Sequence, residues 1–357
     1  MKKLLYVSDS FRSLSVFESQ VHTLCNKHAE RYDVTLLALC KASEMSLPSL
    51  PGAKYKLEKF KKLPKFFSMF SQKIALLTFK QASLFEQADI IHCRGHIGTL
   101  FALLVCRKHG INKPIISDIR GVVPEEFLSL DIPLSSLYSK LANHVESYLF
   151  KNIDQFFFVS SNMEAHYRQK YGKYSFSSEI YPTIVNDELF FQDDEKRKKK
   201  REELGYSKEN KVYCYVGNTA SWQKLDSILT AFDNKSRKDD ELRLLVVTTE
   251  PGAVKEMLQN LGIVNPHITV TSSEYKNVPQ FLNAADYGLL IRDDNVVNRV
   301  ASPTKRNEYA ACGLPIVTRL ADIGELKKHE SLSDYKSLDT IAYGQSNCYE
   351  NLLTQSS

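Results

Sequence analysis

The sequence lacks the long hydrophobic runs and the closely paired cysteines that mark several classes of protein. No stretch of its 357 residues approaches the roughly 20 uninterrupted apolar residues that a membrane span needs. The first residues resemble a signal peptide, but their apolar run is short and reaches Asp9 without a small-residue cleavage site, so we expect a β-strand at 4–8. The seven cysteines show no close paired spacing, which excludes a zinc cluster or a CxxC redox motif. Their odd number and apolar surroundings are typical of buried thiols in a reducing cytoplasm.

A strong excess of one charge is also absent. The net charge is +5, the basic residues are dispersed, and no nucleic-acid-binding motif is present, so we expect no nucleic-acid partner. The densest charged run, residues 193–203, predicts a solvated linker and the start of a helix.

Short apolar or β-branched runs alternate with helical patterns along most of the chain. This alternation predicts parallel sheets covered by helices on both faces, because a parallel connection needs a long crossover. Two series of strands imply two doubly wound, Rossmann-like domains, at 1–192 and 193–357. A closing helix near 349–353 belongs to the second domain, and packing of this helix back on the first domain is an open alternative. The expected strands are 4–8, 34–38, 90–93, 114–118 and 155–160, then 212–216, 243–248, 268–271, 287–291 and 315–318.

The segment 292–317 carries the strongest chemical signal. An expected strand ends in a polar loop, and Pro303 then opens a helix with Ser302 as its cap. A helix N-terminus at the carboxyl edge of a parallel sheet is suited to a phosphate group. Lys305 would add positive charge, and Glu308 could accept two hydrogen bonds from a ribose diol. An ordinary capped helix with surface charges fits the same spacing, so this alternative stays open.

This segment, from Ser302 through Glu308 to the Gly-Leu-Pro at 313–315, resembles the donor-site signature of retaining glycosyltransferases of family 4, which have the GT-B fold. Further stretches match that family in the expected order: 88–92, 158–163, 181–190, 215–217 and 278–286. The resemblance covers most of the chain. It implies two Rossmann-like domains facing across a cleft, with an acceptor-binding first domain and a donor-binding second domain.

Carried over position by position, the resemblance makes Glu308 the carboxylate that holds the donor ribose and Lys224 a basic residue near the diphosphate. Two positions depart from the family, because Asn218 replaces an expected arginine and Val300 replaces an acidic residue. In this chain Arg299 and Lys305 would then supply the positive charge. The full set expected to bind the donor is Gly217, Asn218, Lys224, Arg299, Ser302, Pro303, Thr304, Lys305 and Glu308.

Polar residues that follow strands of the first domain are candidates for the acceptor side. The loop after the first strand has no glycine but contains Arg12, and the segment after the strand at 114–118 contains Asp118, Arg120 and Glu125. Arg120 could contact substrate, or Asp118 and Arg120 could simply pair with each other. His92, Arg94 and His96 cluster at the end of another strand. We expect catalytic roles for Arg120, His92 and His96, and acceptor contacts from Arg12, Arg94, Asp118 and Glu125.

From Lys54 to Lys80, lysines alternate with phenylalanines, among them Phe60, Phe66, Phe67 and Phe70. This composition fits docking on an anionic membrane surface. It equally fits a loop and helix whose rings pack on the first domain.

The resulting hypothesis is a glycosyltransferase. It moves a sugar from a nucleoside diphosphate sugar to a glycan or lipid-linked acceptor in bacterial surface polysaccharide synthesis, and the resemblance implies retention at the anomeric carbon. Lys224, Arg299 and Lys305 would stabilise the leaving diphosphate. We expect no metal and no other cofactor, and a cytoplasmic location, optionally peripheral on the inner face of the membrane. A non-catalytic GT-B subunit and a nucleotide-sugar epimerase are the alternatives.

Overall fold

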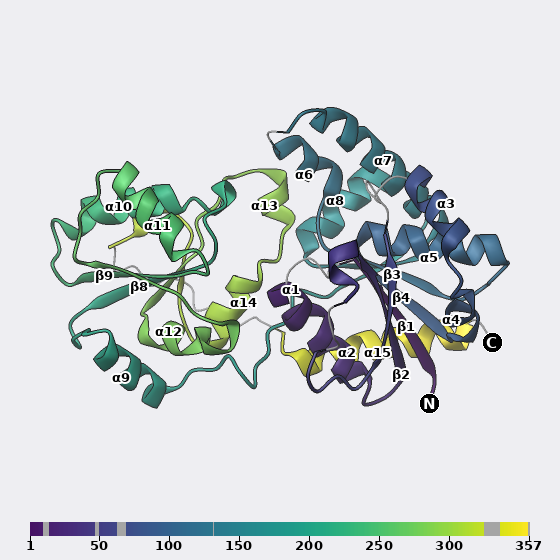
Figure 1. Ribbon diagram of the computed structural model, residues 1–357, viewed down its shortest axis with the longest axis horizontal. Coiled ribbons are helices and arrows are strands. Elements are labelled where there is room, and N and C mark those ends of the chain that lie inside the picture. Colours follow the sequence, from purple (N-terminus) through teal and green to yellow (C-terminus); the bar gives the residue numbers. More distant parts are fainter. Residues whose placement is uncertain (10–13, 47–49, 63–68, 131, 325–335, 356–357) are drawn as a thin grey trace. The chain divides into compact units, whose positions relative to one another are not determined.

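The computed structural model describes residues 1–9, 14–46, 50–62, 69–130, 132–324 and 336–355. They form two compact units (Figure 1). Unit 1 comprises Met1–Ile184, Asn295–Ser302 and Ser337–Ser357, and unit 2 comprises Val185–Asp294 and Pro303–Lys336. Each unit is built on one parallel sheet with helices between successive strands, as the alternating pattern predicts.

The sheet of unit 1 has the strand order β3-β2-β1-β4-β5-β6-β7, and every neighbouring pair is parallel. This order places the ends of β1, β4 and β5 side by side at the carboxyl edge, where ligands of open α/β sheets bind. The strands are β1 (Lys3–Ser8), β2 (Asp33–Cys40), β3 (Lys56–Lys61), β4 (Ile90–Arg94), β5 (Ile115–Ile119), β6 (Gln155–Phe158) and β7 (Ser177–Ile180).

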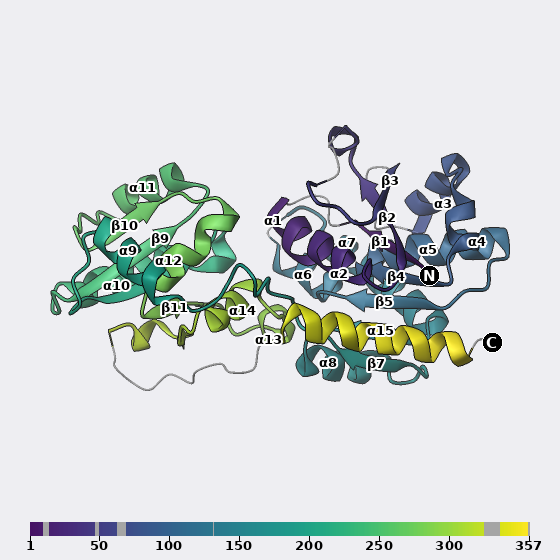
Figure 2. The ribbon, with the colours of Figure 1, turned by 90° about the horizontal axis from the view of Figure 1, so that it is seen from below.

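Helices cover both faces of this sheet and bury a separate apolar core on each (Figures 1 and 2). The core on one face includes side chains of α3 (Met69–Thr78), α4 (Ala82–Gln87), α5 (Gly95–His109), α7 (Ser135–Asn152) and α8 (Ser161–Tyr171). The core on the other face includes α2 (Thr23–His28) and the C-terminal helix α15 (Leu338–Gln355). The shorter helices of unit 1 are α1 (Leu14–Phe17), a π-helical turn (Glu18–His22), a 3-10 turn (Ala42–Glu44), α6 (Val123–Ser129) and α13 (Val296–Val300).

Unit 2 has a parallel sheet of order β10-β9-β8-β11-β12. Its strands are β8 (Lys211–Val216), β9 (Leu242–Val247), β10 (Ile268–Thr271), β11 (Tyr287–Leu289) and β12 (Ile316–Val317). Its helices are α9 (Asp194–Glu203), α10 (Leu225–Ser236), α11 (Pro251–Asn260), α12 (Val278–Ala284) and α14 (Thr304–Ala311), and its 3-10 turns are Ser221–Gln223, Tyr275–Asn277 and Leu320–Asp322.

The units divide at Ile184 and Val185, earlier than the division expected at 192 and 193. Val185 and Phe190 pack in the core of unit 2, so the chain has already joined that unit before the charged run begins. The chain also returns to unit 1 at Asn295–Ser302, because Val300 is buried in the core of unit 1. The tail from Ser337 onward belongs to unit 1 as well.

The charged run at 193–203 is more than a solvated linker. It forms helix α9, capped by Asp193, whose side chain accepts a hydrogen bond from the Lys196 N–H. Arg201 is only 7% exposed and donates to the carbonyl oxygens of Ser207 and Asn210, which satisfies a buried guanidinium. The buried Arg201 therefore attaches α9 to the rest of unit 2 through these hydrogen bonds.

The segment from Lys54 to Lys80 is not one continuous element. It begins with the edge strand β3, which the sequence analysis did not predict, and ends with α3. Phe60 packs on the core of unit 1, but Phe70 of α3 is 74% exposed. Lys65, Phe66 and Phe67 lie outside the described residues.

All seven cysteines are buried and unbonded, as their apolar surroundings indicate. Within the described ranges, the helices are too short or too polar to cross a bilayer.

Candidate active site

In unit 2, a partly buried lysine and a buried glutamate from α14 lie beside the carboxyl end of β8. Lys305 Nζ donates a hydrogen bond to Gln223 Oε1 at 2.9 Å and lies 4.7 Å from the centroid of the Tyr215 ring. Glu308, one turn further along α14, is 5% exposed. We refer to Tyr215, Gln223, Arg292, Lys305 and Glu308 as the donor-side cluster.

Burial shifts the pKa values of the two charged groups toward each other. Desolvation and, to a smaller extent, the charge of Arg292 lower the pKa of Lys305 to about 7, although Glu308 opposes the shift. Desolvation raises the pKa of Glu308 to about 7, against a hydrogen bond from Tyr275 and the charge of Lys305. Both charged forms are therefore disfavoured in this cluster. An anion next to Lys305, or hydroxyl donors next to Glu308, would restore the charged forms.

Glycine at position 217 permits the close approach of the lysine. A Cβ atom at Gly217 would collide with Lys305 Nζ and would lie 3.0 Å from both Lys305 Cε and the Tyr215 hydroxyl. The adjacent Asn218 accepts a 2.6 Å hydrogen bond from the Tyr215 hydroxyl through its backbone carbonyl. The turn after β8 is thus fixed around the lysine.

Lys224 lies at the start of α10 and takes the left-handed conformation, with φ of 54°. Its Nζ pairs with Asp293 Oδ1 at 3.0 Å, and both side chains are partly exposed. This ion pair links the N-terminus of α10 to the loop after β11. A phosphate group near Lys224 would therefore have to compete with Asp293.

The structure assigns two of the expected donor residues to unit 1 and changes the expected roles of two others at the start of α14. Arg299 and Ser302 belong to unit 1, whereas Lys305 belongs to unit 2. The Ser302 hydroxyl does not cap α14, because it accepts a hydrogen bond from the Thr183 N–H at 3.2 Å. Pro303 is the N-cap residue rather than the first helical residue, and Thr304 is the first residue of α14.

The sequence analysis did not identify Arg292 and Gln223 as members of the cluster. Arg292 follows β11, and burial lowers its pKa, with opposing effects from Tyr215 and Tyr309. A basic residue that directly follows a strand at the carboxyl edge is a signal that could have identified it. The contact of Gln223 with Lys305 depends on the 3-10 turn at Ser221–Gln223, which has no clear sequence signature.

Unit 1 contains a cavity of ≈ 380 Å³ at the carboxyl edge of its sheet. The first turn of α5, the residues after β5, and helices α6 and α7 line it. Its polar lining comes from Asp9, His96, Arg120 and Glu126, and its apolar lining includes Ile97, Val123, Phe127, Ala142 and Val145. The cavity therefore combines hydrogen-bonding groups with an apolar wall, which suits a sugar ring.

Arg120 lines this cavity and also pairs with Asp118. Its Nη2 and Nε donate to Asp118 Oδ2 at 2.7 and 2.9 Å. Burial alone would raise the pKa of Asp118, but Arg120, His92 and Arg94 hold it at about 2. Asp118 is fully buried, so it orients Arg120 rather than reaching a ligand itself.

His92 does not reach the cavity. It is fully buried, with Nδ1 2.5 Å from the Tyr349 hydroxyl of α15 and Nε2 3.3 Å from Asp118 Oδ2. Burial lowers its pKa. His92 therefore supports Asp118 through its Nε2 contact and is not among the residues that line the cavity. His96 does line the cavity.

Of the two adjacent glutamates on α6, Glu126 and not Glu125 lines the cavity. Glu125 Oε1 is paired with Lys170 Nζ at 2.9 Å and lies 3.4 Å from His166 Nε2. Burial raises the pKa of Glu126. Arg94 is 5% exposed and precedes α5, with Nη1 3.8 Å from Asp118 Oδ2, and Arg12 lies outside the described residues.

Comparisons with known proteins agree with this architecture. A family model described as Glycosyltransferase Family 4 matches residues 17–188, and one described as Glycosyl transferases group 1 matches residues 210–340. No curated protein matches the sequence significantly.

Among solved structures, sucrose-phosphate synthase from Thermosynechococcus elongatus matches with a TM-score of 0.76 and 12% identity, over 99% of this chain and 100% of that chain. HepE from Anabaena, solved in complex with UDP-glucose, matches with a TM-score of 0.64 and 14% identity, over 98% and 90%. WaaG, described as a glycosyltransferase involved in lipopolysaccharide biosynthesis, matches with a TM-score of 0.61 and 14% identity, over 98% and 93%.

These matches define the fold as GT-B, with two Rossmann-like units. The chain belongs to the glycosyltransferases that combine a family 4 N-terminal region with a group 1 C-terminal region.

Proposed function

We propose that this glycosyltransferase takes its sugar from a nucleoside diphosphate sugar bound at the donor-side cluster. The observation that carries the proposal is the pair Lys305 and Glu308 on α14, the first partly buried and the second buried, whose pKa values both move to about 7. A diphosphate next to Lys305 would favour its charged form, and the ribose hydroxyls would donate to the Glu308 carboxylate. HepE, a structure of the same fold, was solved with UDP and with UDP-glucose.

In this proposal, positively charged groups of the protein, and not a metal ion, stabilise the negative charge of the leaving diphosphate. Lys305 and Arg292 lie together in the cluster, and the N-terminus of α14 adds the partial positive charge of its free N–H groups. Lys224 contributes if the ligand displaces Asp293 from it. Fixed positive groups of this kind stabilise charge that develops in the transition state. Retention at the anomeric carbon is part of the proposal, on the family resemblance alone.

The acceptor in this proposal is a glycan or lipid-linked sugar that binds in the cavity of unit 1, and the reaction serves the synthesis of a bacterial surface polysaccharide such as capsule or O-antigen. The mixed polar and apolar lining of the cavity supports a sugar as the ligand. WaaG supports the surface-glycan role by its described part in lipopolysaccharide biosynthesis.

Contact with the inner face of the membrane is proposed through the surface of α3. Phe70, Ile74 and Leu77 are spaced along one side of the helix and are exposed by 74%, 39% and 78%. Lys73 and Lys80 are exposed close to them in sequence. Apolar side chains flanked by lysines favour the interface of an anionic bilayer.

A non-catalytic nucleotide-binding subunit is the second candidate. The observation in its favour is Val300, which stands where the family has an acidic residue and is 3% exposed in an apolar core. A subunit of this kind would bind a nucleoside diphosphate but release none from the corresponding sugar nucleotide.

The test is calorimetric titration with UDP, GDP, ADP and CDP, followed by measurement of diphosphate release from the sugar nucleotide of the base that binds. We expect Lys305→Ala and Glu308→Ala each to weaken binding at least about tenfold, which corresponds to 1.4 kcal/mol. Arg306→Ala, on the exposed face of the same helix, is the matched control. Binding of a nucleotide that is equally tight in all three variants would refute the proposed donor site.

A further inference from the structure

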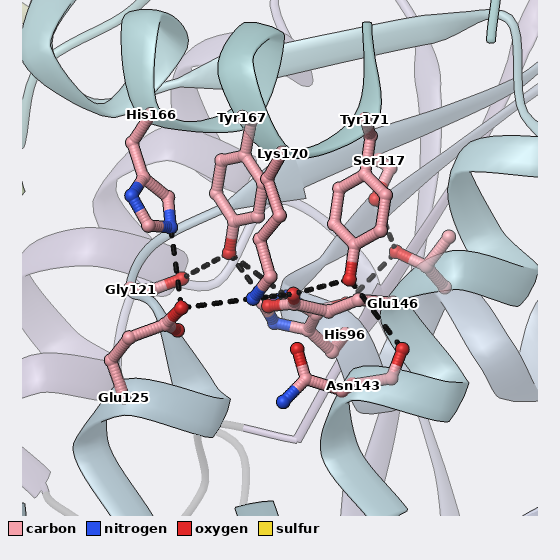
Figure 3. A network of polar contacts seen from close by, with 12 residues as sticks. His96, Ser117, Gly121, Glu125, Asn143, Glu146, His166, Tyr167, Lys170 and Tyr171 are labelled. Atoms are coloured by element: carbon pink, nitrogen blue, oxygen red, sulfur yellow. Dashed lines mark hydrogen bonds and ion pairs between the residues drawn. The ribbon is translucent and has the colours of Figure 1, made fainter. Parts of the chain in front are cut away.

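A polar network in unit 1, separate from the donor-side cluster, surrounds the imidazole of His96 (Figure 3). His96 is the second residue of α5, lines the cavity and is 7% exposed. Its Nε2 lies 3.0 Å from Glu146 Oε1 and 3.3 Å from the Tyr167 hydroxyl. Within the part of the chain that the structure describes, its Nδ1 forms no hydrogen bond.

Glu146 of α7 is fully buried and uses both of its oxygens. Oε1 accepts from His96 and from the Tyr167 hydroxyl at 2.8 Å. Oε2 accepts from Lys170 Nζ at 2.8 Å and from the Tyr171 hydroxyl at 3.1 Å. Burial alone would raise the pKa of Glu146, but the hydrogen bond from His96 and the charge of Lys170 hold it below its ordinary value.

An ionised carboxylate can only accept hydrogen bonds, so the imidazole nitrogen that faces Glu146 must carry a proton. In the neutral ring this leaves the lone pair on Nδ1, and the partner of one ring nitrogen thereby decides the role of the other. Contacts from three helices hold the carboxylate and the imidazole in this arrangement (Figure 3). Tyr167, Lys170 and Tyr171 of α8 donate hydrogen bonds to the Glu146 carboxylate on α7. His96 lies in the first turn of α5 and faces the same carboxylate.

We propose that Glu146 is a positioning residue that holds His96 in the Nε2-protonated tautomer, so that Nδ1 accepts a hydrogen bond from a sugar hydroxyl of the acceptor in the cavity of unit 1. Arg120 and Glu126, which line the same cavity, provide a donor and an acceptor for neighbouring hydroxyls. The part that concerns the acceptor rests on the proposed function, whereas the tautomer does not.

The test is nitrogen-15 NMR of the histidine side chains in the full-length protein, with His96 assigned by its absence in His96→Gln. We expect an unprotonated Nδ1 and a protonated Nε2 in the wild type. Glu146→Met keeps the volume of the side chain but removes the acceptor, and should populate the tautomer with a proton on Nδ1. Glu125→Gln is the matched control, because it removes a carboxylate that also pairs with Lys170 but does not contact His96.

A protonated Nδ1 in the wild type, or the same single tautomer in Glu146→Met, would overturn the positioning role. Glucose then serves as a probe of sugar hydroxyls. A shift of the Nδ1 resonance on titration supports the acceptor contact, and no shift at the highest glucose concentration overturns it. Calorimetric titration of the same variants with nucleoside diphosphates reports on the donor site separately. A failure of donor binding therefore remains distinguishable from a failure of this proposal.

Discussion

Lys305 occupies the space that a side chain at Gly217 would fill, and this gives the lysine its place beside the Tyr215 ring. A Cβ atom at 217 would collide with Lys305 Nζ and come within 3.0 Å of its Cε. The end of a long lysine side chain can move aside at little cost to the fold. The φ of Gly217 is also 156°, which residues other than glycine rarely adopt, so adding a methyl group both displaces the charge and strains the backbone.

We accordingly predict that Gly217→Ala weakens binding of the nucleoside diphosphate by about tenfold and also lowers the melting temperature, because the backbone at 217 is strained by any side chain. Calorimetric titration and thermal unfolding measure the two effects. Gly252→Ala is the control, because a Cβ atom at Gly252 has nothing within 4 Å. Unchanged nucleotide affinity in Gly217→Ala would show that the position of Lys305 does not matter for binding.

The buried carboxyl group of Glu308 makes the stability of the protein depend on pH. Its pKa rises from 4.5 to about 7 on folding, so between these values the folded protein retains a proton that the unfolded chain has lost. The contribution of this group to stability is fully present below pH 4.5 and is lost as the pH rises through 7.

Glu308→Gln removes this loss, so we predict that the variant gains melting temperature relative to the wild type at pH 7.5 but not at pH 4.5. A gain of about 1 kcal/mol would correspond to roughly 2–4 °C. Glu256→Gln, on an exposed position of α11, should show no such pH-dependent difference. The same substitution in Glu308 should weaken nucleotide binding, so stability and binding would change in opposite directions.

The hydrogen bond between His92 and Tyr349 connects the C-terminal helix to the sheet of unit 1. The two groups are fully buried, and the Tyr349 hydroxyl also lies 3.4 Å from His28 Nε2. Tyr349→Phe leaves His92 Nδ1 without this partner, and we predict a loss of about 1–2 kcal/mol in the free energy of unfolding. Denaturant unfolding measures it, with Tyr343→Phe as control because Tyr343 is 56% exposed on the same helix. Equal stability of the two variants would argue against the buried contact.

The sequence predicts most strands because a buried parallel strand is a short apolar run, and all ten expected strands overlap observed ones. The two strands that it misses, β3 and β7, end the sheet of unit 1 on either side. Their sequences, KLEKFK and SSEI, are polar because edge strands are only partly buried. Polar edge strands carry little of the apolar signal on which the prediction depends.

The candidate site is predictable where neighbours in sequence are also neighbours in space. Lys305 and Glu308 are one turn apart on α14, and spacing alone places them together. Sequence spacing could not show which of Glu125 and Glu126 lines the cavity. This depends on the orientation of α6 relative to α8, because Lys170 of α8 forms an ion pair with Glu125. Sequence spacing also could not show that Val300 packs in the core of unit 1, and that Arg299 therefore belongs to unit 1 as well.

The surface of α3 gives the last prediction, which concerns the membrane. Exposed apolar side chains at 70, 74 and 77 would enter the interface, and exposed lysines of the segment from Lys54 to Lys80 would face anionic headgroups. Each lysine near such a surface contributes about 1 kcal/mol to binding. Replacing Lys56, Lys61, Lys73 and Lys80 by glutamate should therefore abolish co-sedimentation with vesicles that contain phosphatidylglycerol.

The control carries the same change of charge in unit 2, at the exposed Lys198, Lys199, Lys208 and Lys238, and should still bind these vesicles. Phe70→Ser with Leu77→Ser separates the two contributions, because it removes apolar area without changing the charge. If binding survives this double substitution but not the charge reversal, the contact is electrostatic and α3 does not insert. If the charge reversal of unit 1 leaves binding unchanged, the docking surface lies elsewhere, and the acceptor reaches the cavity of unit 1 without contact between α3 and the bilayer.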